Sequence, residues 1–393
     1  MKSLFSIQKY AAVFVLGIGA LVTSCDDDPI PLNDPTIGGG EEFEYTWSQT
    51  ADSLQAATYN TFLGSNGTFI QNNAGNSTFH YWPNAHALDV LTDGYLRTGD
   101  QNYVTKMKAL LEGIKIKNGN TYNNVFNDDM IWLGNACVRA YNATNDEDYK
   151  DVALELWEII KQSWSDDIFG GGITWKQDTP YQKNAVSNAP AAILAMRLYE
   201  IDQNPDDLIW AEKIYDWQKN TLVNPANGIV WDNISSDGPQ GTPVVNSDWV
   251  FTYNMGTYIG AGVWLYNATG DQSYLTDAVK SAKTLLTSPQ LTSEGILKDE
   301  GQGDGGLFKG ILVRYLTELI EVSAINSTDR SSFVNFLRFN ATTFYNDGLL
   351  RPSMMCGPNW KNTPTGITDL TTQLSGVMLI EAAAKLHEEQ LLD

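Results

Sequence analysis

Apolar residues recur three and four positions apart along most of the chain, a spacing that places them on one face of an α-helix. The pattern holds over twelve segments and predicts an all-α protein. Helix-start signals agree with it, because Pro83, Pro205 and the acidic run from Asp146 to Asp148 stand where first turns are expected. The expected helices span residues 45–63, 81–97, 101–117, 128–143, 147–163, 187–202, 205–221, 252–268, 271–287, 306–324, 329–346 and 369–390.

The connections between these helices alternate between short and long. Several short connections share the signature Thr-Gly-Asp-x-x-Tyr or a close variant, ending at Tyr103, Tyr149 and Tyr274, which is an internal repeat. Six hairpins give a period of about 58 residues, too long and too irregular for an open tetratricopeptide array with its repeat of about 34 residues. The sequence therefore predicts a closed toroid of six helical hairpins.

The alternation also predicts which end of the toroid is functional. Antiparallel neighbours send every long connection to one face, and loops on a rigid scaffold commonly carry function. The helices that begin on that face, near residues 81, 128, 187, 252, 306 and 369, have small and apolar interiors, as in the segment from Gly256 to Gly262. We expect these helices to form the inner ring and the more charged helices to form the outer ring.

The N-terminus has the order of a secretory signal that ends in a lipobox. Lys2 and Lys9 precede an apolar run over residues 10–22, and Cys25 follows. A run of about 13 apolar residues is shorter than the roughly 20 needed to span a bilayer. We expect a signal peptide over residues 1–24, an acidic, Pro- and Gly-rich tether over residues 25–42, and one large domain over residues 43–393.

Cys25 would be the acylated first residue of the mature protein. The acidic run over residues 26–28 resembles the export tag of surface lipoproteins in Bacteroidetes-type bacteria. The expected location is the outer membrane, with the protein held by its lipid and facing the cell exterior.

Charge and cysteine content narrow the partners. The net charge of −22 disfavours nucleic acid and anionic membrane surfaces, since both need a basic face, and favours a neutral substrate. Cys137 and Cys356 are the other cysteines, and whether they pair stays open. No Cys or His cluster has zinc-site spacing, and His80 and His86 are interpreted as structural. We expect no metal, no cofactor and a monomer.

Asp128 and Asp129 are the candidate catalytic residues. They open an expected inner helix on the functional face, where the helix N-terminus favours negative charge. Retaining glycosidases need two carboxyls about 5–5.5 Å apart, and proximity raises the pKa of one of them. The pattern alone slightly favours the ordinary alternative, in which Asp128 is a helix N-cap and Asp129 a first-turn acid. Asp166-Asp167 competes on the same face, whereas Asp206-Asp207 lies on the opposite face.

Several motifs together resemble glycoside hydrolase family 76, the α-1,6-mannanases. The resemblance covers most of residues 45–390. The motifs that carry it are Asn127-Asp128-Asp129-x-x-Trp132, Gly170-Gly171-Gly172-Ile173-x-Trp175, Lys183-Asn184-x-x-x-Asn188-Ala189-Pro190, Tyr253-Asn254-x-Gly256, Phe308-Lys309-Gly310 and Arg314-Tyr315-Leu316.

The resemblance implies an (α/α)6 barrel and a retaining endo-α-1,6-mannanase that acts on α-mannan polysaccharide. Asp128 would be the nucleophile and Asp129 the acid/base. Tyr253, Asn254 and Asn188 would bind sugar hydroxyls, and Lys309 would orient a carboxylate. Sugar stacking is expected from aromatic residues of the long loops, Trp175 first, then Tyr181, Trp231, Trp249 and Trp360.

The Gly- and Asp-rich segment over residues 299–306 matches neither a phosphate-binding nor a calcium-binding loop. We expect a mobile loop beside the cleft, with Asp304 in contact with substrate. Two alternatives remain at this point. A transglycosylase of the same fold would pass the glycosyl group to another sugar, and a SusD-type glycan-binding lipoprotein would have no catalytic pair.

Overall fold

The computed structural model describes residues 45–392, so the expected signal peptide, the tether and Cys25 lie outside the described residues. No helix in the described part is long and apolar enough to cross a membrane. The described chain holds twelve α-helices, which are α1 (Trp47–Phe62), α2 (Tyr81–Thr98), α3 (Gln101–Lys117), α4 (Asn127–Thr144), α5 (Glu147–Lys161), α6 (Ala189–Asp202), α7 (Pro205–Leu222), α8 (Thr252–Thr269), α9 (Gln272–Thr287), α10 (Gly305–Glu321), α11 (Ser327–Thr343) and α12 (Leu370–Glu388).

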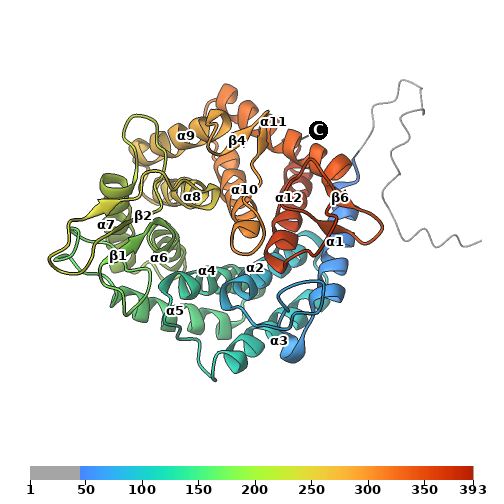
Figure 1. Ribbon diagram of the computed structural model, residues 1–393, viewed down its shortest axis with the longest axis horizontal. Coiled ribbons are helices and arrows are strands. Elements are labelled where there is room, and N and C mark those ends of the chain that lie inside the picture. Colours follow the sequence, from blue (N-terminus) through green and yellow to red (C-terminus); the bar gives the residue numbers. More distant parts are fainter. Residues whose placement is uncertain (1–44, 393) are drawn as a thin grey trace, which may run out of the picture.

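The helices form two concentric rings. Helices α2, α4, α6, α8, α10 and α12 surround the axis, and the odd-numbered helices lie outside them (Figure 1). Each inner helix packs against the next, and α12 packs against α2 to close the ring. The inner helices are buried along most of their length, whereas the outer helices bury one face. The predicted (α/α)6 barrel is confirmed, and the predicted helix boundaries agree to within a few residues.

Small residues let the inner helices approach closely, as the sequence predicts. A Cβ atom at Gly256 of α8 would lie 2.6 Å from Leu312 Cα of α10. At Gly260, one turn further on, a Cβ atom would lie 2.4 Å from the ring of Tyr315. These contacts leave no room for a larger residue.

The repeated short turns end one helix and start the next by capping. Gly99 and Gly270 adopt left-handed conformations, with φ of 69° and 72°, and end α2 and α8. The following residues, Asp100 and Asp271, accept hydrogen bonds from backbone N–H groups of the next helix. Each turn thus provides hydrogen-bond partners for unpaired backbone groups at the end of one helix and at the start of the next, which explains why its sequence recurs.

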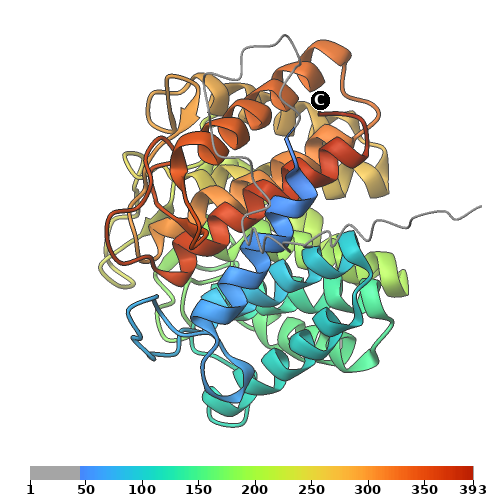
Figure 2. The same cartoon turned by 90° about the vertical axis from the view of Figure 1, so that its right-hand side faces the viewer.

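The long connections gather at one end of the barrel, on the left in Figure 2. They carry short antiparallel strands that the helical pattern does not predict. Strands β1 (Gln182–Asn184), β2 (Asn233–Ser235) and β3 (Val244–Val245) form a sheet in the order β1-β2-β3. Strand β4 (Thr292–Ser293) pairs with β5 (Ile296–Leu297). Strand β6 (Leu349–Leu350) pairs with β7 (Met355–Cys356).

Cys137 and Cys356 are both buried, and they do not form a disulfide with each other.

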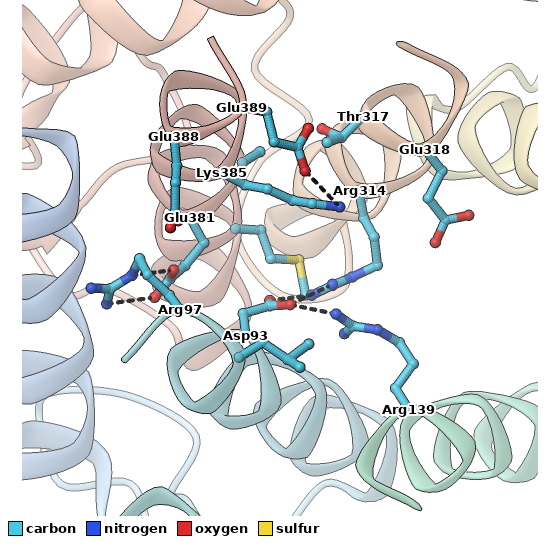
Figure 3. A pocket seen from close by; sticks show the side chains of 13 residues that line it. Asp93, Arg97, Arg139, Arg314, Thr317, Glu318, Glu381, Lys385, Glu388 and Glu389 are labelled. Atoms are coloured by element: carbon cyan, nitrogen blue, oxygen red, sulfur yellow. Dashed lines mark hydrogen bonds and ion pairs between the residues drawn. The ribbon is translucent and has the colours of Figure 1, made fainter. Parts of the chain in front are cut away.

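Buried ion pairs fill the barrel toward its other end. Arg314 contacts both carboxylate oxygens of Asp93, at 2.8 and 2.6 Å, and Arg139 bridges Asp93 and Asp89. A cavity of about 420 Å³ lies beside them, with a rim of ion-paired side chains from α2, α10 and α12 (Figure 3). Most charges around this cavity are paired with one another, as Asp93 is with Arg314 and Arg139.

Candidate active site

Asp128 and Asp129 lie in the first turn of α4, at the long-loop end of the barrel. The N-cap position is occupied by Phe126, which makes no side-chain cap, so neither aspartate is the helix cap. Asp128 Oδ2 accepts a hydrogen bond from Trp175 Nε1 at 3.2 Å, and Asp128 Oδ1 accepts one from the backbone N–H of Asp129 at 3.1 Å. Both carboxyls are partly exposed.

The residue before the pair holds the start of α4 in place. Asn127 is fully buried, and its amide donates to Thr174 O at 2.8 Å while its Oδ1 accepts from Ser163 Oγ at 3.1 Å. Its backbone N–H donates to Trp175 O at 3.0 Å. The same contacts position Trp175, so the catalytic pair and its hydrogen-bond donor form one rigid unit.

The electrostatic surroundings affect the pKa values of the two aspartates differently. Burial raises the pKa of Asp128 to about 7, the charge of Asp304 adds to this, and the hydrogen bonds from Trp175 and Asp129 N oppose it. Burial raises the pKa of Asp129 well above its usual value, and the charges of Asp128 and Asp304 add to the rise. Because only Asp128 receives hydrogen bonds that stabilise its charged form, it ionises first and Asp129 keeps the proton.

Asp304 is the third carboxyl of the site, and it comes from the loop before α10. Its Oδ1 accepts a hydrogen bond from Trp82 Nε1 at 3.2 Å. The loop is hydrogen-bonded to the segment before α12, since Gln302 donates to Ile367 O at 2.7 Å and Gly303 N donates to Asp369 Oδ2 at 2.9 Å. These contacts fix the position of Asp304 next to the pair.

Tyr253 and Asn254 begin α8 and share a buried acceptor. Tyr253 OH and Asn254 Nδ2 donate to Asp232 Oδ1, at 3.4 and 3.0 Å. The Tyr253 ring stacks on Phe308 with 3.9 Å between centroids. Burial raises the pKa of Asp232. Burial also raises the pKa of Tyr253, and the charges of Asp232 and Asp128 add to that rise. Tyr253 thus lies within electrostatic range of the nucleophile candidate.

Glu300 links the starts of two inner helices. Its carboxylate accepts hydrogen bonds from the backbone N–H of Thr252, at 2.9 Å, and from the Thr252 hydroxyl, so it caps α8 from another loop. A Cβ atom at Gly305, the first residue of α10, would lie 1.9 Å from Glu300 O. Glu300 therefore ties the helix that bears Tyr253 to the helix that follows Asp304.

Asn188 does not face a substrate. It is fully buried, accepts a hydrogen bond from Ile173 N at 2.8 Å, and donates to Asn184 O at 2.8 Å and to Ile173 O at 3.1 Å. Its side-chain amide is hydrogen-bonded to backbone groups of Ile173 and Asn184, so Asn188 supports the loop and does not bind substrate, contrary to prediction. A polar residue at an inner-helix start can serve either purpose, and sequence does not distinguish them.

Lys309 is also buried away from the pair. Its Nζ donates to Pro358 O and lies 4.2 Å from the ring centroid of Trp360. Burial lowers its pKa to about 8, and the acidic groups that oppose this are Glu300 and Asp299. If Lys309 stabilises a carboxylate, that carboxylate is Glu300 and not Asp128 or Asp129.

The loop aromatics differ in exposure. Trp175 is partly exposed against Asp128, Trp249 is 55% exposed, and Trp360 is buried in the core. Tyr181 and Trp231 are partly exposed. Trp82, Asp232 and Glu300 belong to the site and were not selected from the sequence. Like Asp128, Trp82 lies in the first turn of an inner helix on the long-loop face, so the sequence pattern could have identified it as a candidate.

Asp166, the competitor for the catalytic role, is a surface residue. Its side chain is 69% exposed, accepts from Trp164 Nε1 at 2.8 Å and pairs with Lys213 at 3.1 Å. These hydrogen bonds hold its pKa below the usual range. An exposed, paired carboxylate has no means of retaining a proton at neutral pH, so Asp166 does not fit the role of a general acid.

Comparison with known proteins identifies the family. The model of Glycosyl hydrolase family 76 matches residues 46–392. The chain belongs to this family. It is therefore a glycoside hydrolase, which excludes the SusD-type binding protein as an alternative.

Two solved structures resemble the chain over nearly all of the described residues. The α-1,6-mannanase of Salegentibacter sp. HEL1_6, as an inactive variant with two consecutive aspartates replaced by asparagine and α-1,6-mannotriose bound, is 57% identical, with a TM-score of 0.85 over 86% of this chain and 99% of that chain. A Listeria innocua protein is 36% identical, with a TM-score of 0.79 over 88% of this chain and 99% of that chain.

Curated relatives from yeasts are more distant. The mannan endo-1,6-alpha-mannosidase DCW1 of Saccharomyces cerevisiae is 27% identical over 271 residues, which cover 64% of this chain and 59% of the relative. The match thus spans about three-fifths of the length of that relative.

Proposed function

We propose that this family 76 chain is an endo-acting α-1,6-mannanase that hydrolyses the backbone of α-mannan with retention of configuration. The observation that carries the proposal is the pair Asp128-Asp129 at the start of α4, with Trp175 hydrogen-bonded to Asp128, in a chain 57% identical to an α-1,6-mannanase. That relative is inactive when a consecutive aspartate pair is replaced, which supports the same role for the pair in this chain.

In the first step, a carboxylate oxygen of Asp128 attacks the anomeric carbon as the bond to the leaving oxygen breaks. Asp129 gives its proton to that oxygen, and a covalent glycosyl-enzyme forms. In the second step, the Asp129 carboxylate takes a proton from water. The water oxygen attacks the anomeric carbon and releases Asp128.

The neighbouring residues support Asp128 as the nucleophile and Asp129 as the acid/base. Trp175 Nε1 hydrogen-bonds to Asp128 and stabilises it as an anion before the attack. Asp304 is exposed and accepts a hydrogen bond from Trp82. Its negative charge raises the pKa of Asp129 and also suits the positive charge developing on the sugar ring.

Asp304 remains a candidate for contact with sugar hydroxyls, and so does Tyr253, which is 9% exposed. Asn254 is fully buried and donates to Asp232, so it supports the site from within, as Asn188 does.

The test is product analysis on an unbranched α-1,6-mannan. We expect a distribution of oligosaccharides from the earliest times, with the α-anomer formed first when the reaction is followed by proton NMR. Release of mannose alone would contradict endo action, and the β-anomer as first product would contradict retention. Longer products at high acceptor concentration would reveal transglycosylation.

We also propose that Cys25 carries a lipid that anchors the enzyme to the outer membrane, facing the exterior, and that the enzyme works there as a monomer. The support is the order of charged, apolar and Cys25 residues at the N-terminus. Labelling with a radioactive fatty acid should mark the full chain and not its Cys25→Ser variant. Protease treatment of intact cells tests the outward orientation, and sedimentation of the purified protein tests the monomer.

A further inference from the structure

The chain over residues 165–172, here called the Gly-rich turn, has an unusual backbone. Phe169, Gly170, Gly171 and Gly172 have φ values of 57°, 69°, 138° and 89°, so four successive residues adopt positive φ. Glycine does this at little cost, whereas a bulky residue such as Phe169 does so only where surrounding contacts compensate. The turn therefore depends on neighbouring side chains for its shape.

Trp217 of α7 packs against one side of the Gly-rich turn. Its Nε1 donates to Phe169 O at 3.0 Å. Cβ atoms at Gly171 and Gly172 would lie 2.7 and 2.6 Å from the Trp217 side chain, so larger residues do not fit at these positions. Trp217 thus limits the turn on that side.

The ammonium of Lys183 binds the carbonyls of the same turn. Lys183 belongs to β1 and is fully buried. Its Nζ donates to Ile168 O at 2.7 Å, to Ser165 O at 2.9 Å and to Gly171 O. Nζ also donates to Ser165 Oγ at 3.2 Å. Because these acceptors are spread over the turn, one cation holds together backbone groups that lie several residues apart.

The charge of Lys183 strengthens these contacts. Burial lowers its pKa to about 8, and the charge of Asp166 opposes the fall, so the ammonium form prevails at neutral pH. A charged donor makes stronger hydrogen bonds than a neutral one. Asp166 itself is exposed and pairs with Lys213 at 3.1 Å. The acceptors of Lys183 are neutral, so this lysine orders the backbone instead of neutralising a carboxylate.

The strand that carries Lys183 also holds the hydrogen-bond donor to the nucleophile. Gln182, the preceding residue of β1, accepts a hydrogen bond from Trp175 N at 3.0 Å. Trp175 Nε1 in turn donates to Asp128 Oδ2 at 3.2 Å. Adjacent residues of β1 therefore hold the backbone of Trp175 and the turn that leads into it.

We propose that Lys183 is a positioning residue for the nucleophile: its ammonium holds the Gly-rich turn in the positive-φ conformation and thereby directs the Trp175 indole N–H toward Asp128. The inference rests on the proposed function, because it assigns Lys183 to the same reaction. Lys183 acts through Trp175 and takes no part in bond cleavage.

The kinetic test uses unbranched α-1,6-mannan. Lys183→Met keeps most of the side-chain volume and removes the ammonium. We expect kcat to fall about 10-fold and KM to change less than about 2-fold, because misplaced groups around a reacting centre slow the chemical step. The matched control is Lys213→Met, which removes an exposed lysine paired with Asp166 of the same turn and should leave both constants unchanged.

The pH profile distinguishes positioning from a loss of folded protein. The hydrogen bond from Trp175 lowers the pKa of Asp128, so the acidic limb of kcat/KM should move to higher pH when this bond is weakened. The other titratable groups that act on Asp128 or respond to its charge are Asp129, Tyr253 and Asp304, and the substitution leaves them in place.

Two further variants test the route of the effect. Trp175→Phe removes the indole N–H, so adding Lys183→Met to it should lower kcat by less than about 2-fold more. Ser165→Ala removes one of the oxygen atoms around Nζ and leaves the ammonium in place. Its kcat should fall about 2-fold, with a smaller shift of the acidic limb in the same direction. If Lys183→Met does not fold, Ser165→Ala decides the outcome.

A measurement that needs no turnover separates the inference from the proposed function. In proton–nitrogen correlation NMR spectra, the indole signal of Trp175, assigned by its loss in Trp175→Phe, should shift as Asp128 ionises. This titration should weaken in Lys183→Met and Ser165→Ala and persist in Lys213→Met. An unchanged titration with an unmoved acidic limb would overturn the inference, whatever happens to kcat, and so would fully multiplicative losses in the double variant. An unmodified enzyme that cleaves no α-1,6-mannan would instead contradict the proposed function.

Discussion

Adjacent aspartates acquire different properties because their neighbours differ. Asp128 receives hydrogen bonds from Trp175 Nε1 and from the Asp129 backbone, whereas Asp129 experiences burial and the charges of Asp128 and Asp304. The first is suited to act as an anion and the second as an acid. The environment therefore divides the roles between two identical side chains.

Replacing Asp304 with asparagine should shift the pH profile of kcat/KM toward lower pH. Activity needs Asp128 ionised, so kcat/KM rises with pH through a pKa of about 7, and it needs Asp129 protonated, so kcat/KM falls at higher pH. Because the charge of Asp304 raises the pKa of both aspartates, its removal lowers both, and both limbs of the profile move to lower pH. Asp166→Asn, at an exposed carboxyl, is the control. A profile that stays in place in Asp304→Asn would contradict this account.

The buried acids should also cost stability when they are ionised. The pKa of Asp128 is raised in the folded state from 3.8 to about 7, so stability falls as the pH rises between these two values and the full cost is present above pH 7. Asp128→Asn should therefore raise Tm at pH 8, by about 1–1.5 °C per kcal/mol recovered in a domain of this size, and less at pH 5, where the folded protein keeps the acid protonated. Differential scanning calorimetry at both pH values checks this, and an equal effect at both would exclude the ionisation as the cause.

Helix position made Asp128 and Asp129 candidates, and the resemblance to family 76 assigned their roles. The structure places both in the first turn of α4, as predicted. Asn188 and Lys309 also belong to inner helices, yet they bind backbone carbonyls. Asp232 and Glu300 lie in long loops, and only tertiary packing brings them to α8. No local pattern contains that information.

At the scale of elements, the starts of the inner helices carry the site, and contacts between loops hold these starts in register. Glu300 caps α8 from the loop that precedes α10. Tyr253 of α8 in turn stacks on Phe308 of α10. These contacts couple the position of Tyr253 to that of Asp304.

Loss of the Glu300 carboxylate should lower activity without abolishing folding. In Glu300→Ala we expect kcat to fall about 10-fold, because misplacement of groups around the reacting centre is costly. Glu300→Gln keeps an acceptor for Thr252 N and should recover most of the activity. Glu294→Ala, at an exposed ion pair in the same connection, should have no effect. Steady-state kinetics with a thermal melt of each variant gives the answer.

A double-mutant cycle tests whether Glu300 acts through α8. Thr252→Val removes the hydroxyl that donates to Glu300, so the double variant should be less impaired than the product of the two single effects. Fully multiplicative losses would show that Glu300 does not act through Thr252.

Helices were more predictable than strands for a physical reason. Apolar periodicity and capping residues such as Asp100 and Asp271 are local, so they fix helix limits directly. The strands are two or three residues long and exist because distant loops pair, as Lys183 does with Ile234. Segments of that length have no sequence period to detect.

At the scale of the whole molecule, the proposed active-site residues and the buried ion-pair network lie toward opposite ends of the barrel. The long-loop end holds the proposed catalytic pair, and the interior toward the short-turn end holds Asp89, Asp93, Arg139 and Arg314 as a buried network. Alternating loop lengths correctly predicted that the long connections gather at one end of the barrel. The ion-pair network was not predicted, because its members lie on three different helices.

Breaking this network should destabilise the protein strongly. Arg314→Leu leaves Asp93 and Asp89 with Arg139 alone, and the loss of one partner from a buried pair costs about 3–5 kcal/mol. We expect a drop in Tm well beyond that of Lys361→Ala, which breaks an exposed pair worth at most about 1 kcal/mol. Equal melting temperatures for the two variants would contradict the stabilising role of the network.

The central claim is that Asp128 and Asp129 cleave α-1,6-linked mannan. The most direct measurement is the rate of reducing-sugar release from an unbranched α-1,6-mannan by Asp128→Asn and Asp129→Asn, with Asp166→Asn as a matched surface control. We expect the first two variants to lose at least about 1,000-fold in kcat, since each removes a group that acts in bond cleavage, and the control to match the unmodified enzyme. Near-native rates in both catalytic-pair variants, with loss of activity in Asp166→Asn, would contradict the account.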